Sequence, residues 1–138
     1  MDDLMKLFDL IGELARRRYQ LAEQHFAALG LNHTEARLLS LLDRADGETT
    51  QDALSNMLFI DRSNAGRGLK KLEEKGYIAK QENEGDKRTR IVRITAKGRQ
   101  AVTKISKLRK KIVQNFFGDL QEDEARVILE LLQKSFEK

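Results

Sequence analysis

The stretch from residue 51 to residue 98 constrains the fold of this chain more than any other. Two segments with helical spacing of apolar residues, 51–57 and 61–75, are joined by a short turn, and Thr50 and Asp61 are suited to cap them. After Gly76, two runs of side chains that suit strands, 77–82 and 90–95, are separated by a polar loop. This order predicts a helix-turn-helix followed by a two-stranded hairpin, or wing.

The second predicted helix has two different faces. Ala65, Leu69 and Leu72 form one apolar stripe, and polar residues repeat that spacing on the opposite side. Arginine can pair with guanine and asparagine with adenine, and the first residues of such a helix usually reach the base edges. An ordinary surface helix would carry a similar pattern, but its place in the helix pair favours DNA reading. The candidate DNA-binding residues here are Gln51, Arg62, Ser63, Asn64, Arg67, Lys70 and Lys71.

The predicted wing ends in a polar and basic loop, residues 84–89. A flexible basic tip can enter a minor groove, because narrow A·T-rich tracts concentrate the negative potential that attracts arginine. Asp86 would be repelled by phosphate, so we expect it to accept hydrogen bonds that hold the loop or an arginine in one geometry. The candidate DNA-binding residues of the wing are Asp86, Lys87, Arg88 and Arg90.

The distribution of charge agrees with this interpretation. The chain has a net charge of +4, and residues 62–93 carry ten Lys or Arg against five Asp or Glu. The remaining 16 basic and 17 acidic residues nearly cancel. The excess positive charge therefore lies where phosphate contacts would be made.

Long segments with helical spacing of apolar residues flank this region, at 3–29, 99–117 and 122–136. A helix of the first length spans roughly 40 Å, too long to bury its apolar stripe against one small domain. We therefore expect residues 1–30 and 99–138 to form dimerisation helices around a winged-helix lobe of residues 31–98. The expected fold class is mainly α with a small two-stranded wing, in a single chain-level unit.

The composition excludes several classes of function. The chain has no cysteine, which excludes disulfides, thiolate metal ligands and thiol redox sensing. His25 and His33 are the only histidines and no nucleotide-binding glycine loop is present, so we expect neither an enzyme nor a cofactor. Zinc held by both histidines with Glu23 or Glu35 is an alternative, although such pairs are more often surface or packing residues. No apolar run approaches a membrane span, and we expect a cytoplasmic protein.

These residues together resemble the multiple-antibiotic-resistance regulator (MarR) family of winged-helix transcription factors. The Asp86-Lys87-Arg88 wing followed by a hydrophobic-Thr-x-x-Gly segment, 94–98, is the most specific part of the resemblance. The other matching residues are Thr50-Gln51, Leu54, Asp61-Arg62-Ser63, the run 72–78 and Val92.

The resemblance implies a homodimer whose terminal helices interlock and whose two lobes bind a pseudo-palindrome. It implies that residues 61–75 enter the major groove and that Arg88 reaches the minor groove. Many members of the family are repressors released by small aromatic anions or other effectors, bound between the dimerisation and DNA-binding parts. The candidate effector-binding residues are Arg16, Arg17, His25, Phe26 and His33. The alternative is that these residues form an ordinary helix surface, with a histidine whose hydrogen bonds are made within the fold.

Three residues depart from the pattern of the family. Gly66 and Gly68 each cost about 0.8–1 kcal/mol relative to alanine inside a helix. Either the backbone approaches DNA closely at these positions, or the helix is soft until it binds. Phe59 replaces a small residue in the turn and could change the angle between the two helices.

The sequence thus predicts a sequence-specific double-stranded DNA-binding transcriptional regulator. We expect a repressor that acts as a homodimer on a pseudo-palindromic operator and is released by a small anionic or aromatic effector. The alternative is a winged-helix protein-interaction module without specific DNA binding.

Overall fold

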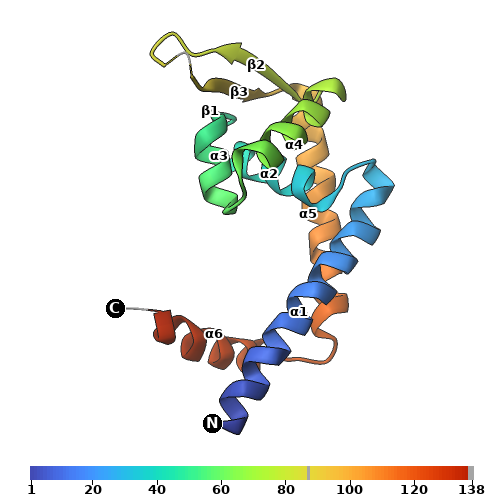
Figure 1. Cartoon of the computed structure of the whole chain (residues 1–138). Helices are drawn as coiled ribbons and strands as arrows, with labels where there is room; N and C mark the ends of the chain where they lie inside the picture. Colours follow the sequence, from blue (N-terminus) through green and yellow to red (C-terminus); the bar gives the residue numbers. More distant parts are fainter. Residues whose placement is uncertain (87, 137–138) are drawn as a thin grey trace.

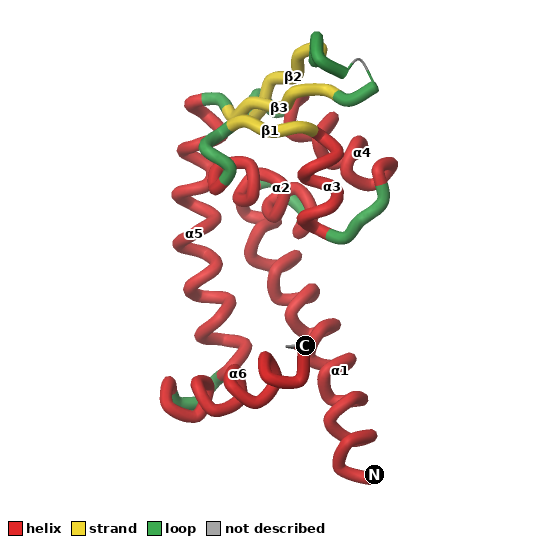
Figure 2. The backbone as a smooth tube through the Cα atoms, turned by 90° about the vertical axis from the view of Figure 1, so that its left-hand side faces the viewer, coloured by secondary structure: helices red, strands yellow, loops and turns green. Residues whose placement is uncertain are grey.

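A computed structural model describes residues 1–86 and 88–136 of the chain. Helices dominate it, and a small sheet lies at one end of the molecule (Figures 1 and 2). The helices are α1 (Asp2–Phe26), α2 (His33–Arg44), α3 (Gln51–Leu58), α4 (Arg62–Glu74), α5 (Ala96–Phe117) and α6 (Glu122–Phe136), with a single 3₁₀ turn η1 (Ala27–Leu29) after α1. The strands are β1 (Glu48–Thr50), β2 (Ile78–Glu82) and β3 (Arg90–Ile94). The predicted fold class, a mainly α winged helix-turn-helix, is confirmed.

Local capping chemistry sets where the helices of the lobe begin. Asn32 and Glu35 form a reciprocal capping box at the start of α2, with Glu35 N donating to Asn32 Oδ1 over 2.7 Å. The side chains of Thr50, Asp61 and Thr95 accept hydrogen bonds at the starts of α3, α4 and α5. The caps at Thr50 and Asp61 agree with the sequence prediction, because capping depends on residues only three positions apart.

The winged lobe is built around one apolar core. Its largest fully buried side chains come from α2, α3, α4 and β3, and are Leu38, Leu39, Leu42, Leu54, Leu69, Leu72 and Val92. The apolar stripe predicted for α4 is therefore buried, and the opposite face of that helix remains exposed. This burial packs α4 against the other elements of the lobe.

The sheet contains a third strand that the sequence analysis did not anticipate. Its strand order is β1-β3-β2, and both pairings are antiparallel. Thr49 of β1 lies opposite Val92, and Lys80 of β2 lies opposite the same residue from the other side. The short strand β1 therefore attaches the beginning of α3 to the base of the wing.

Gly98 allows the first turn of α5 to lie directly against the start of β2. A Cβ atom at this position would collide with the carbonyl oxygen of Tyr77 and would come within 2.7 Å of Ile94 Cγ1. The same carbonyl accepts a hydrogen bond of 3.0 Å from Thr95 N. This close packing at Gly98 joins the wing to the long helix α5.

The two glycines of α4 have a role that neither sequence hypothesis included. Gly68 is buried, and a Cβ atom there would lie 2.7 Å from Leu38 Cδ1 of α2. A Cβ atom on Gly66 would lie 3.3 Å from Gln51 Nε2 of α3. Both glycines therefore let α4 approach the other helices of the lobe.

Two apolar helix surfaces extend beyond the lobe (Figures 1 and 2). α6 has no buried residue, and the buried residues of α1 are Ala22 and Phe26, near its C-terminal end. Large exposed apolar side chains on these helices include Leu4, Phe8, Ile11, Val127, Leu129 and Leu131. Among the described residues, no helix is both long enough and apolar enough to cross a membrane.

Candidate nucleic-acid interface

The exposed face of α4 carries a chain of polar contacts along its first turns. Asp61 caps the helix through Asn64 N over 2.7 Å, and its other carboxylate oxygen accepts from Asn64 Nδ2 over 3.2 Å. Asn64 Oδ1 in turn accepts from Arg67 Nη2. These contacts orient the amide of Asn64 and the guanidinium of Arg67 before any DNA is bound. Ser63 and Lys70 are exposed on the same helix, and Lys71 lies 3.9 Å from Glu74.

The wing loop holds its exposed arginine through a carboxylate. Asp86 Oδ1 accepts from the backbone N of Arg88 over 3.0 Å and from its Nε over 3.2 Å. The side chain of Arg88 is 92% exposed, so its outer nitrogens face solvent. Arg90 is exposed at the start of β3, whereas Lys87, also a predicted contact, lies outside the described residues. Asp86 thus has the geometry expected of a residue that orders an arginine.

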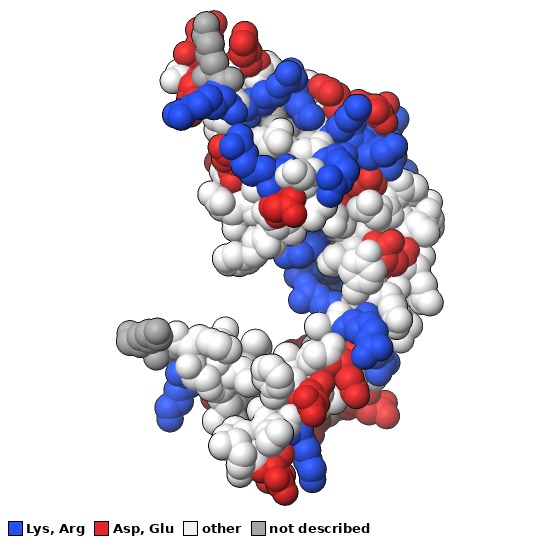
Figure 3. Space-filling view, viewed as in Figure 1, with Lys and Arg blue, Asp and Glu red and all other residues white. Residues whose placement is uncertain are grey.

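Arg62 connects α4 to the wing. Its Nη2 donates to the carbonyl oxygen of Arg88 over 3.3 Å, and its Nε lies 3.0 Å from Asp52 Oδ1 on α3. Gln51, next to Asp52, is half-buried against Gly66. The candidates Gln51, Arg62 and Arg88 therefore lie in one continuous region. In Figure 3, lysine and arginine side chains gather over the upper lobe, which carries α4 and the wing.

Comparisons with known proteins agree with this geometry. The MarR family model matches residues 29–89, the part that contains the helix-turn-helix and most of the wing loop. An uncharacterised HTH-type transcriptional regulator of Bacillus subtilis, YdgJ, is 29% identical over 106 residues. That match covers 77% of this chain and 64% of YdgJ, slightly less than two thirds of the relative.

Solved structures match over almost the whole chain. A mutant MarR of Escherichia coli in complex with operator DNA matches with a TM-score of 0.84 at 23% identity, covering 99% of this chain and 97% of that one. A MarR transcriptional regulator of Methanosarcina mazei Go1 also has a TM-score of 0.84, at 24% identity, covering 96% of this chain and 94% of that one. The chain is thus similar to the MarR family in sequence over residues 29–89, and it shares the fold of these solved structures over nearly its whole length.

The chain also has a cleft between α1 and α2, with a volume of about 380 Å³. Its lining combines guanidinium groups with aromatic rings, and the rings of Tyr19 and His33 meet edge to face at 5.6 Å. The lining residues are Ala15, Arg18, Tyr19, His33, Thr34 and Arg37.

The cleft gathers positive charge beside the half-buried His33. Burial, followed by the charges of Arg18 and Arg109, lowers the pKa of Arg37. Burial, followed by Arg37 and Arg18, lowers the pKa of His33 against the opposing effect of Glu23. His33 Nδ1 is screened from solvent and has no hydrogen-bond partner among the described residues. An anion in the cleft would relieve the repulsion among these cations.

The structure does not bring the five predicted effector residues together. Only His33 lines the cleft. Arg16 is exposed, Phe26 is buried in the core, and His25 Nδ1 lies 2.9 Å from the carbonyl oxygen of Leu21. Arg17 donates to the carbonyl oxygen of Asn115 and lies over the ring of Phe116. Helical spacing could have identified Arg18 and Tyr19, because both share a face with Ala15 and the buried Ala22.

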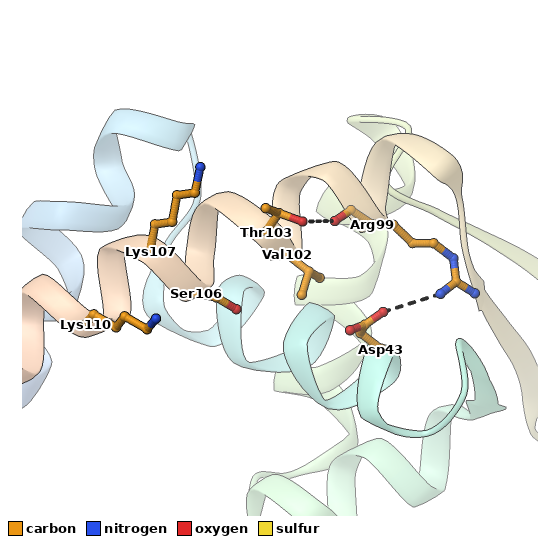
Figure 4. Close-up of a pocket in the computed structure, with 7 residues that line it drawn as sticks. All are labelled: Asp43, Arg99, Val102, Thr103, Ser106, Lys107 and Lys110. Atoms are coloured by element: carbon orange, nitrogen blue, oxygen red, sulfur yellow. Dashed lines mark hydrogen bonds and ion pairs between the residues drawn. The ribbon is translucent and has the colours of Figure 1, made fainter.

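A second cleft, of about 450 Å³, follows α5 beside the end of α2 (Figure 4). Arg99, Lys107 and Lys110 line it from different turns of α5, and Arg99 Nη1 lies 3.5 Å from Asp43 Oδ1. Figure 4 shows that the side chains of Lys107 and Lys110 leave the helix in different directions. These cations do not converge on one point, so we assign no ligand to this cleft.

The zinc alternative gains no geometric support. Within residues 1–86 and 88–136, no three His, Asp or Glu side chains are grouped so that they could hold a metal ion. Glu23 Oε1 instead accepts from the backbone N of His33 over 2.7 Å, and Glu35 forms an ion pair with Lys75. Both carboxylates therefore have structural partners.

Proposed function

We propose that this protein is a DNA-binding transcriptional regulator, in which α4 reads the major groove and Arg88 enters the minor groove. The observation that carries the proposal is the contact from Arg62 to the carbonyl oxygen of Arg88, which places the N-terminus of α4 and the wing tip in one surface. Preorganised arginine and asparagine side chains on that surface suit base reading. The match to a MarR protein solved with operator DNA supports the same orientation.

We propose that the active form is a cytoplasmic homodimer bound to a pseudo-palindromic operator. The exposed apolar faces of α1 and α6 support dimerisation, because a soluble monomer rarely exposes so much contiguous apolar surface. Two-fold symmetry is the commonest arrangement for such an assembly, and it repeats the reading surface on DNA. A dimer bound over a promoter would exclude the polymerase, and we therefore propose repression.

We propose that a small anionic or aromatic effector releases the dimer from DNA by binding between α1 and α2. The repulsion among Arg18, Arg37 and Arg109 and the aromatic ring of Tyr19 support a ligand that carries a carboxylate on an aromatic ring. The same cleft includes Thr34, which lies near Gly68 of the recognition helix. Occupancy of the cleft can therefore alter the packing of α4.

The test of DNA reading compares Arg88→Ala with Lys107→Ala in a competition titration against a labelled operator duplex. Both variants remove one positive charge, but Lys107 belongs to α5, which lies across the lobe from α4 (Figure 2). Arg88→Ala should weaken operator binding by about 5-fold to 100-fold, the loss expected for one base-reading arginine. Equal effects of the two variants would favour the interaction-module alternative.

The test of effector binding uses salicylate as an aromatic carboxylate probe. Salicylate should raise the melting temperature of the wild-type protein and weaken its binding to the operator. Arg37→Gln should lose both responses, and Arg16→Gln should keep them because Arg16 does not line the cleft. Identical responses in all three proteins would remove the cleft from the proposal.

A further inference from the structure

Asp52 is an acidic residue within a surface that otherwise suits phosphate. It lies in the first turn of α3, next to the candidate DNA contact Gln51. Its Oδ1 is 3.0 Å from Arg62 Nε, and Arg62 Nη2 reaches the carbonyl oxygen of Arg88 at 3.3 Å. One carboxylate therefore fixes a guanidinium that spans α3, the start of α4 and the wing.

The inner oxygen of Asp52 depends on this guanidinium. Although the side chain of Asp52 is 43% exposed, Oδ1 itself is screened from solvent and has no aligned hydrogen bond among the described residues. Arg62 is the positive charge in ion-pair distance of it. Movement of Arg62 toward a distant phosphate would break both this ion pair and the contact with the wing carbonyl.

The ion pair contributes little to stability, because the Arg62 side chain is 66% exposed and water screens the attraction. Its effect is on the direction of Arg62. Two nitrogens of the guanidinium are engaged, by Asp52 and by the wing carbonyl, and the remaining N–H groups are left to bind DNA. Their direction is therefore set before binding.

Asp52 also weakens binding to DNA in which no base accepts hydrogen bonds from the oriented guanidinium of Arg62. A carboxylate near phosphates weakens every complex through repulsion, whatever the DNA sequence. The repulsion is offset where the fixed guanidinium meets a matching base, and it is not offset on unrelated DNA. The two effects together increase the difference between correct and incorrect sites.

We propose that Asp52 is a positioning residue that sets the DNA sequence specificity of this protein by holding Arg62 between the recognition helix and the wing. The inference rests on the proposed function, since it requires that this surface reads duplex DNA. The DNA group that Arg62 would recognise in this arrangement is a base edge in the major groove that accepts hydrogen bonds from the fixed guanidinium, such as guanine O6 and N7.

The test measures the affinity of wild type and Asp52→Asn for two duplexes of equal length, the selected operator and an unrelated sequence. Asp52→Asn should bind unrelated DNA more tightly than wild type does, because one negative charge has been removed. Binding to the operator should gain less or should weaken. The ratio of the two affinities should fall by about 5-fold to 10-fold, the lower part of the range for one bidentate base contact.

Asp46→Asn is the matched control. It removes one carboxylate from the turn before β1, where the backbone has a φ of 59° that asparagine adopts readily. This variant should raise both affinities by similar factors and leave their ratio unchanged. Far-UV circular dichroism and urea unfolding of Asp52→Asn should resemble those of wild type.

A double-mutant cycle separates positioning from a general structural effect. In an Arg62→Ala background, Asp52→Asn should no longer change the ratio, because the group it positions is absent. An unchanged ratio in the single variant would overturn the inference, as would an equal fall with and without Arg62. If wild type itself does not discriminate between the duplexes, the proposed function fails first, which is a different result from a failure confined to Asp52.

Discussion

A partly buried ion pair joins the end of α4 to α2, and Lys75→Met tests its contribution to stability. Lys75 Nζ lies 2.9 Å from Glu35 Oε1 and donates to the carbonyl oxygen of Gly30 over 2.6 Å. The Glu35 side chain is only 4% exposed, whereas that of Lys75 is 33% exposed. Removal of the lysine would therefore leave a carboxylate buried without its counter-charge.

The structure allows the cost of Lys75→Met to be estimated. Removal of one partner from a fully buried pair costs about 3–5 kcal/mol. The partial exposure of Lys75 and the remaining hydrogen bond from Asn32 N to Glu35 reduce this, and we expect a loss of about 2–3 kcal/mol. The measurement is the free energy of unfolding from urea titrations at one fixed protein concentration, because dimerisation would make stability concentration-dependent.

Glu35→Gln provides the control, because glutamine can keep its place in the capping box without a charge. In that background Lys75→Met should cost at least about 1 kcal/mol less than it does in wild type, since no carboxylate is then left unpaired. The reasoning would be refuted by a Lys75→Met protein within about 0.5 kcal/mol of wild type, or by an equal cost in both backgrounds.

Three further changes test individual features of the fold. Gly98→Ala should destabilise the protein by about 1–3 kcal/mol, measured by urea unfolding, because the new Cβ would collide with the carbonyl of Tyr77; unchanged stability would contradict this packing. Phe59 is 94% exposed and has a φ of 56°, in the left-handed region. Phe59→Gly should raise the melting temperature, because it relieves about 1–2 kcal/mol of backbone strain, less the entropy cost of glycine. A lower melting temperature would contradict this strain. Burial lowers the pKa of His33 in the folded protein, so the unfolded chain takes up this proton at a higher pH, and the free energy of unfolding should fall as the pH drops below about 6.5. His33→Gln should reduce this loss of stability in urea titrations from pH 7.5 to pH 5.5. An unchanged dependence of stability on pH would contradict the lowered pKa of His33.

Features governed by neighbouring residues could be predicted from the sequence. The caps at Thr50 and Asp61 depend on partners within one helical turn, and both are present. The apolar stripe of α4 followed from its spacing alone. The order of helices and hairpin then restricted the fold to a winged helix-turn-helix.

Features that depend on distant partners could not be read in the same way. β1 has only three residues, and its pairing with β3 joins segments more than 40 positions apart. The sequence interpretation of Gly68 was a close approach to DNA or a soft helix. It missed the actual neighbour of Gly68, Leu38, because that residue belongs to a different helix. The pairing of Asp52 with Arg62 likewise depends on the angle between α3 and α4, which local spacing does not specify.

The choice of effector-binding candidates on α1 required knowledge of which face of that helix packs against α2. Arg16, Arg17 and Arg18 are consecutive, and a rotation of about 100° between neighbours decides which of them faces α2. Arg18 lines the cleft, whereas Arg17 reaches the carbonyl oxygen of Asn115 on α5. A choice of residues from the face shared with Ala22 would have included Arg18 and Tyr19.

Selection of binding sites from random duplex DNA by the purified wild-type protein, at physiological salt and with excess competitor, tests the central claim most directly. We predict enrichment of a two-fold symmetric sequence whose half-sites are centred about 10 bp apart, one for each lobe of a dimer. Recovery of unenriched DNA after repeated rounds, or of a single asymmetric half-site, would contradict the claim that the protein reads DNA as a symmetric dimer.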